Sequence, residues 1–392
     1  MQNILELDSG SNSDFLTQES LAVRRIDEES LREVERRMAV VVLTKNEKLE
    51  VFKGVLTGIP HNCLVIVVSN SQRRRIDRFK MEWESVHCHY HFSDREALVV
   101  HQKDPKFARA SLEANYSELL GDDGLVRDGK SEGMVMGLLL AMSLGKDYVG
   151  FIDADNYIPG SVLEYVRNYA AGFSMTTSPY AMVRMLWGRK RRVPGDAYFR
   201  KWGTVSKLCN QCIDSLISVK VGFETEIVKT ACAGEHAMSI RLAELLPYAS
   251  GFAVEPYEMI AILEQFGDML PLPPAEIMEH GVEIFQIETR NPHIHEERAE
   301  HHLTKEILLP CFSAIYHSPL CETSTKQMIM DVLVSHKCLQ PWEEPPSPMI
   351  MPPPRKMNKQ KFAAFIQEHF GEYAVGKSAG YVAKSLAKAS SL

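Results

Sequence analysis

The sequence predicts an α/β fold organised around a mostly parallel β-sheet. Short runs of β-branched and apolar residues lie at 38–44, 63–68 and 148–153, and longer stretches with helical character separate them. Each run ends in small polar or acidic residues. In a parallel sheet these ends meet along one edge, which is where open α/β sheets bind their ligands. We therefore expect the functional site at that edge.

Composition and charge narrow the class of protein. The chain has 392 residues, of which 45% are hydrophobic and 24% charged, as is typical of a globular protein. Its net charge of −7 disfavours a general nucleic-acid binder. No apolar run approaches the length of about 20 residues needed to span a bilayer. Residues 1–37 hold no apolar signal segment, and the eight scattered cysteines suit reduced thiols. We expect a cytoplasmic protein without a membrane or nucleic-acid partner.

The two ends of the chain differ from its middle. Residues 1–37 are polar and charged, which indicates an N-terminal arm or an exposed helix. Residues 341–354 are rich in proline and predict an extended connector. Four large apolar residues then share one stripe of a predicted helix at 358–370. This stripe would dock on the body of the protein or on a second subunit of a homodimer.

The third apolar run leads directly into two carboxylates, Asp153 and Asp155, before a Pro-Gly turn. Acceptor-only oxygens so close together repel each other unless a cation joins them. Mg²⁺ and Mn²⁺ prefer such hard ligands and often share them with phosphate oxygens. The pattern indicates a metal–diphosphate site. An acidic turn at the end of a strand is the simpler interpretation, because Asp-x-Asp alone is common.

Residues 124–131 match the P-loop pattern G-x-x-x-x-G-K-[ST]. A P-loop must leave a buried strand and enter a helix, but residues 113–123 are polar and contain no apolar strand. A simpler interpretation does not require a P-loop. Lys130, at the start of a predicted helix over 131–144, offers a cation and free N–H groups to an anion.

Three clusters in the second half of the chain have two interpretations each. The basic excess at 184–207 is either a solvated face or a surface for phosphate or carboxylate groups. The single Cys-x-x-Cys of Cys209 and Cys212 is more typical of packing than of zinc or redox chemistry. His293 and His295 follow a strand-like run and a proline. Each is either exposed or a metal ligand opposite the Asp-x-Asp.

Local patterns predict three further details. Ser161 and Glu164 form a capping box at the start of a helix, with Gly172 as its C-cap. Residues 224–228 have the pattern of a strand, and residues 233–236 lead into a helix.

Taken together, these segments resemble the mannosyl-3-phosphoglycerate synthase family. The resemblance rests on residues 40–47, 127–133, 151–157, 191–207, 233–239 and 288–297 and covers residues 38–340. It implies a retaining glycosyltransferase of GT-A architecture, with a Rossmann-like sheet and a C-terminal extension on the acceptor side. The nucleotide-binding half would be 38–160, and the acceptor and metal half 161–340.

The resemblance implies transfer of mannose from GDP-mannose to the 2-hydroxyl of 3-phosphoglycerate. A divalent cation, Mg²⁺ or Mn²⁺, would take part, and the product would lead to the compatible solute mannosylglycerate. A double-displacement mechanism needs a carboxylate nucleophile on the opposite face of the sugar, and the sequence identifies none. Front-face attack by the acceptor hydroxyl, assisted by the leaving phosphate, is therefore the hypothesis.

The resemblance also implies roles for single residues. The donor would be bound by Leu43, Thr44, Asn46, Glu47, Ser69, Lys130 and Asp153. Asp153 and Asp155 would hold the metal with His295, or with His293 as the alternative. Glu255 would contact the donor sugar and complete the catalytic carboxylates with Asp153 and Asp155.

The acceptor phosphate would lie against Gly203, Thr204, Ser206 and Lys207. Here the sequence departs from the family pattern Gly-Arg-Val-(Ser/Thr)-Glu, because residues 203–207 are Gly-Thr-Val-Ser-Lys. Either Lys207 or Lys201 replaces the missing arginine, or the acceptor differs.

The sequence is also compatible with three functions other than this reaction. A P-loop NTPase would need Lys130 for ATP or GTP hydrolysis without any acceptor. A non-catalytic nucleotide-sugar-binding protein would bind GDP-mannose without releasing GDP. A related glycosyltransferase could use another donor or acceptor.

Overall fold

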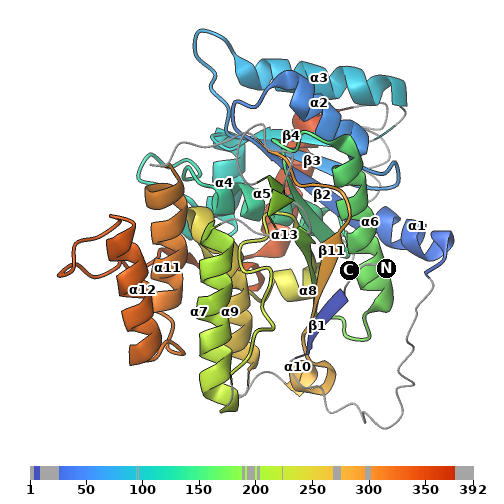
Figure 1. Cartoon of the computed structure of the whole chain (residues 1–392). Helices are drawn as coiled ribbons and strands as arrows, with labels where there is room; N and C mark the ends of the chain where they lie inside the picture. Colours follow the sequence, from blue (N-terminus) through green and yellow to red (C-terminus); the bar gives the residue numbers. More distant parts are fainter. Residues whose placement is uncertain are drawn as a thin grey trace.

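The computed structural model describes residues 4–8, 26–93, 95, 97–187, 190–191, 199–200, 204–222, 224–267, 275–295 and 302–375. Within them a nine-stranded sheet has the order β1-β11-β6-β9-β5-β2-β3-β4-β13 (Figure 1). Its central strand β2 (Met38–Thr44) lies between β5 (Tyr148–Asp153) and β3 (Leu64–Ser69), and β4 (Ala97–His101) follows β3. These four strands are parallel to one another.

One short strand interrupts the parallel pattern. β6 (Ala181–Trp187) and β11 (Glu283–Thr289) are parallel to each other, whereas β9 (His236–Ser239) lies antiparallel between β5 and β6. The prediction of a mostly parallel α/β sheet is confirmed. The edge strands β1 (Ile4–Asp8) and β13 (Ala374–Val375) pair antiparallel with β11 and β4. Residues 4–8, expected in a polar arm, thus extend the sheet.

Helices cover both faces of the sheet, and each face has its own apolar core (Figure 1). One core includes α1 (Glu28–Arg36), α2 (Leu49–Gly58), α3 (Arg78–Ser93) and α6 (Pro159–Met175). The other includes α4 (Pro105–Glu113), α5 (Lys130–Ser143), α7 (Thr204–Val221), α9 (Val254–Phe266), α11 (Leu309–Tyr316), α12 (Thr323–Ser335) and α13 (Lys359–Tyr373). In β2, Val40 and Val42 face the first core and Ala39 and Val41 the second. A continuous apolar run therefore fills both cores, because successive side chains point to opposite faces.

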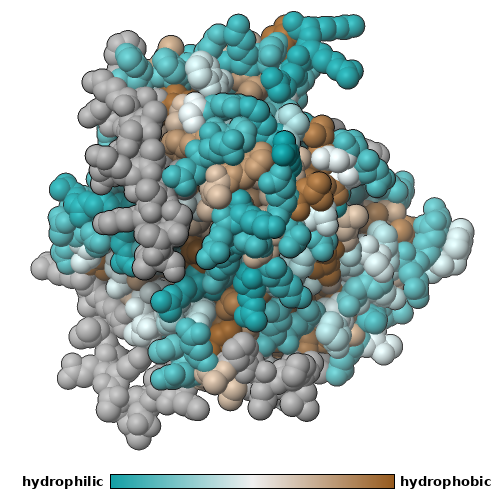
Figure 2. Space-filling view, turned by 180° about the vertical axis from the view of Figure 1, so that it is seen from behind, coloured by the Kyte–Doolittle hydropathy of each residue, from teal (hydrophilic) through white to brown (hydrophobic). Residues whose placement is uncertain are grey.

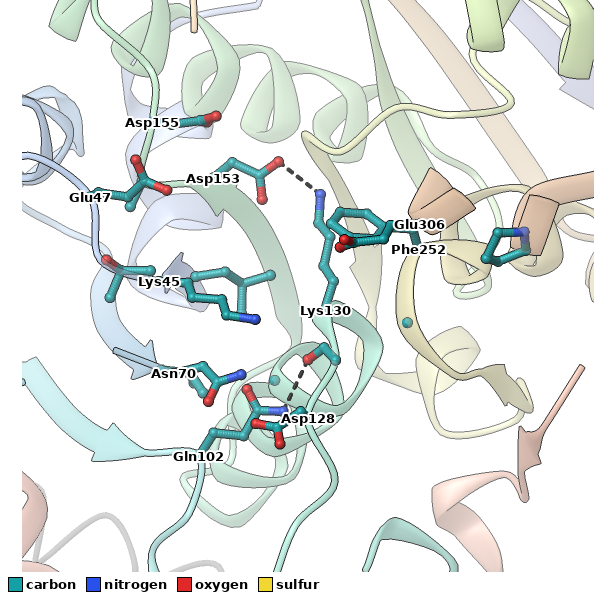
Figure 3. Close-up of a pocket in the computed structure, with 18 residues that line it drawn as sticks. Lys45, Glu47, Asn70, Gln102, Asp128, Lys130, Asp153, Asp155, Phe252 and Glu306 are labelled. Atoms are coloured by element: carbon teal, nitrogen blue, oxygen red, sulfur yellow. Dashed lines mark hydrogen bonds and ion pairs between the residues drawn. The ribbon is translucent and has the colours of Figure 1, made fainter. Parts of the chain in front are cut away.

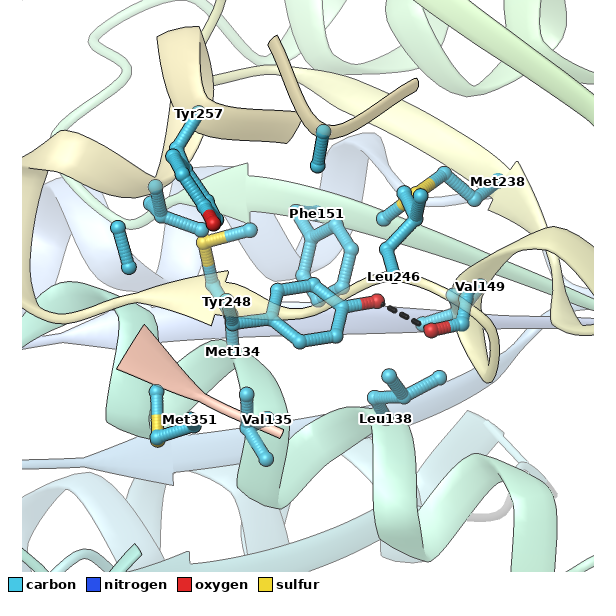
Figure 4. Close-up of a cluster of buried hydrophobic side chains, with 14 of the residues drawn as sticks. Met134, Val135, Leu138, Val149, Phe151, Met238, Leu246, Tyr248, Tyr257 and Met351 are labelled. Carbon is cyan, nitrogen blue, oxygen red and sulfur yellow. Dashed lines mark hydrogen bonds between the residues drawn. The ribbon is translucent and has the colours of Figure 1, made fainter. Parts of the chain in front are cut away.

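The core on the α5 face sets the geometry of the site. Figure 4 shows Phe151 of β5 in this core together with Met134 and Leu138 of α5 and the ring of Tyr248. The Tyr248 hydroxyl donates a hydrogen bond of 2.7 Å to the carbonyl of Ala243, which satisfies the one polar atom of this buried ring. The packing holds the N-terminus of α5 against the carboxyl end of β5, where the two sequence motifs meet.

The C-terminal part of the chain docks on this body. β12 (Ile350–Met351) lies within the proline-rich segment and pairs with β10 (Tyr248–Ala249). α13 forms where a helix was predicted, and its apolar stripe is buried in the α5-side core, which confirms docking on the body. The shorter elements are η1 (Ser117–Leu119), β7 (Lys190–Arg191), β8 (Phe199–Arg200), α8 (Ile240–Ala243), η2 (Gly251–Ala253), α10 (Ala275–His280), the π-helical η3 (His302–Leu308) and η4 (Pro354–Lys356).

The surface seen in Figure 2 is mostly hydrophilic, and its hydrophobic residues form patches between polar ones. In the part of the chain that the structure describes, no helix is both long enough and apolar enough to cross a membrane. A homodimer stays a prediction.

The predicted start and end of α6 are wrong. The helix begins at Pro159, and the hydroxyl of Ser161 donates to the Pro292 carbonyl at 3.0 Å. Glu164 accepts hydrogen bonds from the backbone N–H groups of Arg290 and Asn291, so it anchors the loop after β11. Gly172 lies inside the helix, which continues to Met175. Both side chains of the predicted capping box therefore bond to residues distant in the sequence instead of capping α6.

The predicted strand at 224–228 and the helix after 233–236 are also wrong. Residues 224–230 have no regular structure, and side chains hold their backbone instead. The N–H of Val228 donates to Asp214 of α7, and the N–H of Lys229 donates to Gln286 of β11. The segment then enters β9, and only the four-residue helix α8 follows.

Candidate functional site

A cavity of about 600 Å³ opens at the carboxyl ends of β2, β3 and β5, the edge at which the sequence predicted a site (Figure 3). This volume suits a small-molecule ligand. Of the residues singled out from the sequence, those lining it are Leu43, Thr44, Glu47, Lys130, Asp153 and Asp155. The opposite wall includes Phe252 and Glu306, which the sequence did not indicate. Pro310 also lines the cavity.

The charged side chains that line the cavity are mostly acidic. The acidic members are Glu47, Asp128, Asp153, Asp155 and Glu306, and the basic members are Lys45 and Lys130. Five carboxylates against two ammonium groups disfavour an anionic ligand by Coulomb repulsion. An anion would therefore need a cation to accompany it into this cavity.

A buried carboxylate organises the ends of β2 and β3. Glu82 of α3 accepts hydrogen bonds from the hydroxyls of Thr44, Ser69 and Ser71, at 3.2, 2.6 and 2.6 Å. Ser69 is fully buried and does not line the cavity, and the Thr44 hydroxyl is used in this network. Their hydroxyls therefore support the strand ends rather than face a ligand.

Asn46 shapes the loop that follows β2. Its φ of 64° is in the left-handed region, which asparagine tolerates better than most residues. Its N–H donates to the hydroxyl of Ser71 at 2.7 Å, and its side-chain oxygen accepts from the N–H of Gln72 at 2.9 Å. Asn46 itself does not line the cavity, but its turn places Lys45 and Glu47 there.

Lys130 lies between two carboxylates at the N-terminus of α5. Its ammonium nitrogen is 2.7 Å from Asp153 Oδ2 and 2.7 Å from Glu255 Oε1, and Figure 3 shows the Asp153 contact. Burial alone would lower the pKa of Lys130, but the two carboxylates outweigh it and raise this pKa. Burial raises the pKa of Glu255 above its usual range, although Lys130 opposes the effect. Lys130 therefore stays a cation and contacts Glu255, which lies 125 positions further along the chain.

Two glycines permit this close packing. A Cβ atom at Gly234 would lie 2.9 Å from the nitrogen of Lys130 and 3.0 Å from Asp153 Oδ2. A Cβ atom at Gly129 would lie 1.9 Å from Glu132 Oε2. Glu132 is buried and accepts hydrogen bonds from the Ser250 hydroxyl and the Gly251 N–H. It thereby fixes the segment that leads to Phe252.

A second buried acid, Glu235, lies behind the Asp-x-Asp turn. Its carboxylate accepts a hydrogen bond of 2.8 Å from the Asn156 side chain, which also donates to the Asp153 carbonyl. Burial, with Asp153 as the next contributor, raises the pKa of Glu235 to about 8. This residue therefore carries a proton over much of the neutral range when no other cation is near.

The two histidines His293 and His295 have different surroundings. The ring of His293 is buried, stacks on Trp187 at a centroid distance of 4.3 Å and lies 3.2 Å from the Tyr165 hydroxyl. His295 is only partly buried. Its loop is joined to the Asp-x-Asp turn by a hydrogen bond of 3.0 Å from the Tyr157 N–H to the Ile294 carbonyl.

The residues at this end of the cavity fit a hard divalent cation. Asp153 and Asp155 offer carboxylate oxygens to the cavity, and Lys130 offsets their charge only in part, while the protonated form of Glu235 is neutral and adds no charge. Among the described residues, Asp153, Asp155 and His295 do not bring three ligand atoms within 4.8 Å of one another. Their oxygens and nitrogen would supply part of a coordination shell, to be completed by a ligand.

Arg184, the first residue of the basic segment, does not lie at the surface. Arg184 is wholly buried, 3.0 Å from Glu258 Oε2, and its guanidinium also donates to the carbonyls of Thr230, Ala231 and Glu255. Glu258 lies 3.1 Å from His236 as well. The prediction that Arg184 belongs to an anion-binding surface is wrong, because a tertiary ion pair holds it in the core.

The predicted acceptor residues lie away from the cavity lining or cannot be placed. Gly203 falls outside the described residues, and Thr204 is the first residue of α7. Ser206 is partly buried and Lys207 exposed on α7. Neither lines the cavity.

The P-loop interpretation lacks its structural context. Residues 114–129, directly before Lys130, form the 3₁₀ turn η1 and a single bridge between Leu120 and Val126, and they contain no strand of the main sheet. The Lys130 ammonium contacts carboxylates. The geometry is that of a charge-paired lysine at a helix start.

Comparisons with known sequences found a matching family model and several relatives. The family model for mannosyl-3-phosphoglycerate synthase (osmo_MPGsynth) matches residues 1–366. The mannosyl-3-phosphoglycerate synthase of Pyrococcus furiosus is 42% identical over 349 residues, which are 88% of each chain. That of Aeropyrum pernix is 37% identical over 349 residues, 89% of each chain.

A solved structure shares the fold. Glucosyl-3-phosphoglycerate synthase from Mycobacterium tuberculosis, in complex with phosphoglyceric acid, gives a TM-score of 0.50 at 18% sequence identity. The match covers 74% of this chain and 84% of that one. At this identity the likeness shows the α/β fold alone.

Proposed function

The chain belongs to the mannosyl-3-phosphoglycerate synthase family, and from this premise we propose that it transfers mannose from GDP-mannose to the 2-hydroxyl of 3-phosphoglycerate. The observation that carries the proposal is the cavity at the ends of β2, β3 and β5, in which Asp153, Asp155 and Lys130 meet. Its position at this edge of the sheet and its volume of about 600 Å³ suit a sugar nucleotide.

The acidic lining supports a metal-dependent reaction. A diphosphate would be repelled by the five lining carboxylates unless a cation came with it. Asp153, Asp155 and His295 would hold Mg²⁺ or Mn²⁺, which would offset the charge of the diphosphate as it leaves. His293 is the weaker choice, because its ring is buried against Trp187.

Lys130 contributes a fixed positive charge next to the reacting groups. Because Asp153 and Glu255 keep it protonated, it can attract the donor diphosphate and stabilise charge that develops during departure. Glu255 would contact the mannosyl ring, and its pairing with Lys130 fixes its orientation. Leu43, Thr44 and Glu47 would contact the nucleotide from the end of β2.

The transfer exchanges one bond for another. The bond from C1 of mannose to the diphosphate oxygen breaks, and its electron pair leaves with GDP. C1 then bonds to the acceptor's 2-hydroxyl oxygen, whose proton passes to the leaving phosphate on the same face. Trapping of a covalent mannosyl-enzyme would contradict this front-face hypothesis.

The start of α7 is the proposed acceptor site. The first backbone N–H groups of an α-helix have no intrahelical partner, so Thr204 to Ser206 can offer donors to a phosphate. Lys207 is exposed and adds a positive charge one turn into the helix.

The deciding experiment measures GDP release from GDP-mannose. 3-Phosphoglycerate and D-glycerate are offered as acceptors with and without Mg²⁺, and the product is identified by mass spectrometry. We expect mannosyl-3-phosphoglycerate, formed only with metal and with retention at C1. Binding of GDP-mannose without GDP release would indicate a non-catalytic binder, and ATP hydrolysis that depends on Lys130 would indicate an NTPase.

Lys207→Glu tests the acceptor site. The change should raise the KM for 3-phosphoglycerate far more than the KM for GDP-mannose, because it reverses charge on the acceptor side only. Adding Thr204→Arg should restore part of the loss. Equal activity on D-glycerate, or an unchanged acceptor KM, would remove α7 from the acceptor site.

A further inference from the structure

Three cysteines that are far apart in the sequence meet next to the cavity wall. They are Cys209 of α7, Cys232 of the irregular segment before β9, and Cys311 of α11. Their sulfur atoms all lie within 4.8 Å of one another, and none of them is in a disulfide. Cys209 and Cys311 are fully buried, and Cys232 is partly exposed.

This spacing fits metal coordination. A zinc ion bound by thiolates at about 2.3 Å places neighbouring sulfurs roughly 3.8 Å apart, within the observed limit. The three ligands come from two helices and a loop that are already packed together, so only small side-chain movements are needed. Among the described residues no other group of three histidine, cysteine or acidic side chains is assembled in this way.

A buried guanidinium lies next to the cluster. The guanidinium of Arg184 donates to the carbonyl of Ala231, the residue before Cys232. The Cys311 sulfur lies 3.3 Å from the Phe252 carbonyl oxygen, an ordinary neutral contact. Binding of a metal ion to thiols releases their protons, so the affinity of such a site rises with pH.

We propose that Cys209, Cys232 and Cys311 form a binding site for a thiophilic d¹⁰ cation, Zn²⁺ or Cu⁺. Three thiolates satisfy a trigonal Cu⁺ ion, whereas Zn²⁺ would take water as a fourth ligand on the partly exposed Cys232 side. Soft sulfur ligands select these ions over Mg²⁺ or Mn²⁺, which prefer oxygen. The cysteine site would therefore bind soft ions, whereas the carboxylates Asp153 and Asp155 would bind Mg²⁺ or Mn²⁺.

An ion at this site would join two parts of the cavity wall. Cys232 is two residues before Gly234, whose backbone packs against Lys130, Asp153 and Glu255. Cys311 follows Pro310, which also lines the cavity. Binding would tie α7, α11 and the segment before β9 together, and it would stabilise the folded chain by mass action. This inference does not depend on the identity of the sugar donor or acceptor.

The test starts from the full chain, purified under reducing conditions and freed of metal. It is titrated with Zn²⁺, Co²⁺ or Cu⁺ while excess Mg²⁺ occupies the oxygen-ligand site. We expect about one thiophilic ion per chain by elemental analysis, sulfur-to-cobalt charge-transfer absorption, and a rise in Tm that saturates at the same ratio. The ion that is retained against a competing chelator distinguishes zinc from copper.

Variants locate the site. Cys232→Ser and Cys311→Ser should lose the charge-transfer band and the bound ion. Cys338→Ser, which changes another buried cysteine, and His91→Ala, which breaks the stacked His87–His91 pair on α3, should keep both. The cobalt spectrum of the unchanged chain decides the question even if a cysteine variant fails to fold. Absence of thiophilic ion binding in the reduced chain, or binding that survives in Cys232→Ser and Cys311→Ser, would overturn the proposal.

Discussion

The ammonium nitrogen of Lys130 lies 2.7 Å from Oδ2 of Asp153, so the start of α5 and the end of β5 share one charge pair. Lys130→Met would leave Asp153 and Glu255 close together without a compensating cation. We expect kcat to fall by about 10²–10³-fold, as for loss of one preorganised charge-stabilising group. Steady-state kinetics with both substrates varied would measure the effect. A variant with unchanged kcat would show that the lysine has only a structural role.

The two histidines should respond differently to substitution. His295→Ala should raise the Mg²⁺ concentration needed for half-maximal activity, with little change in Tm. His293→Ala removes a ring stacked on Trp187 and should lower the free energy of unfolding by about 0.5–3 kcal/mol instead. Metal titrations of activity and thermal melts of both variants test the assignment. The reverse pattern would exchange their roles.

Substitutions at Ser69 and Asn70 should distinguish a residue that supports the strand ends from one that contacts the ligand. Ser69→Ala removes a buried hydrogen bond of 2.6 Å to Glu82 and should cost about 1–3 kcal/mol of stability, with little change in the KM for the donor. Asn70 lines the cavity, so Asn70→Ala should raise that KM with little loss of stability. Denaturant melts and kinetics on the same preparations give both quantities. A higher donor KM in Ser69→Ala alone would return its hydroxyl to the donor site.

Arg184 should matter for folding rather than for the acceptor. Arg184→Met leaves Glu258 buried without its partner and should destabilise the chain by about 3–5 kcal/mol. Glu258→Gln combined with Arg184→Met should recover part of this loss, because it removes the uncompensated charge. Urea unfolding of the single and double variants measures the coupling. A raised acceptor KM at unchanged stability would contradict the buried role.

Stability without added metal should depend on pH through Glu235. Its folded-state pKa of about 8 lies above the ordinary glutamate value of 4.5, so the folded chain retains a proton that the unfolded chain releases. This contribution is fully present below about pH 4.5 and is lost as the pH rises through about 8. We expect the free energy of unfolding to decrease over that range in chelator.

Glu235→Gln is the matched control for this pH dependence. The amide keeps a side-chain oxygen for Asn156 but cannot ionise, so the decrease should become shallower. Denaturant melts at a series of pH values compare the two chains. An identical pH profile in both would assign the effect to another group.

Local sequence patterns were enough to predict the sheet and the edge that carries the site. The apolar runs ending at Thr44, Ser69 and Asp153 form adjacent strands, because periodicity and strand-end polarity are properties of short segments. The same patterns predicted α5 with Lys130 at its start and the C-terminal helix. The family resemblance, confirmed by the matching relatives, added the reaction class.

Only the tertiary structure decided which side chain meets which. Lys130 pairs with a carboxylate 125 residues away, Arg184 with one 74 residues away, and Cys209 has Cys232 and Cys311 as neighbours rather than Cys212. No local pattern contains such partners, since they depend on which elements the sheet order and helix packing bring together. The same reason explains why the capping box at Ser161 and the strand at 224–228 were wrong. Ser161 and Glu164, for example, form hydrogen bonds with residues distant in the sequence instead of capping the helix.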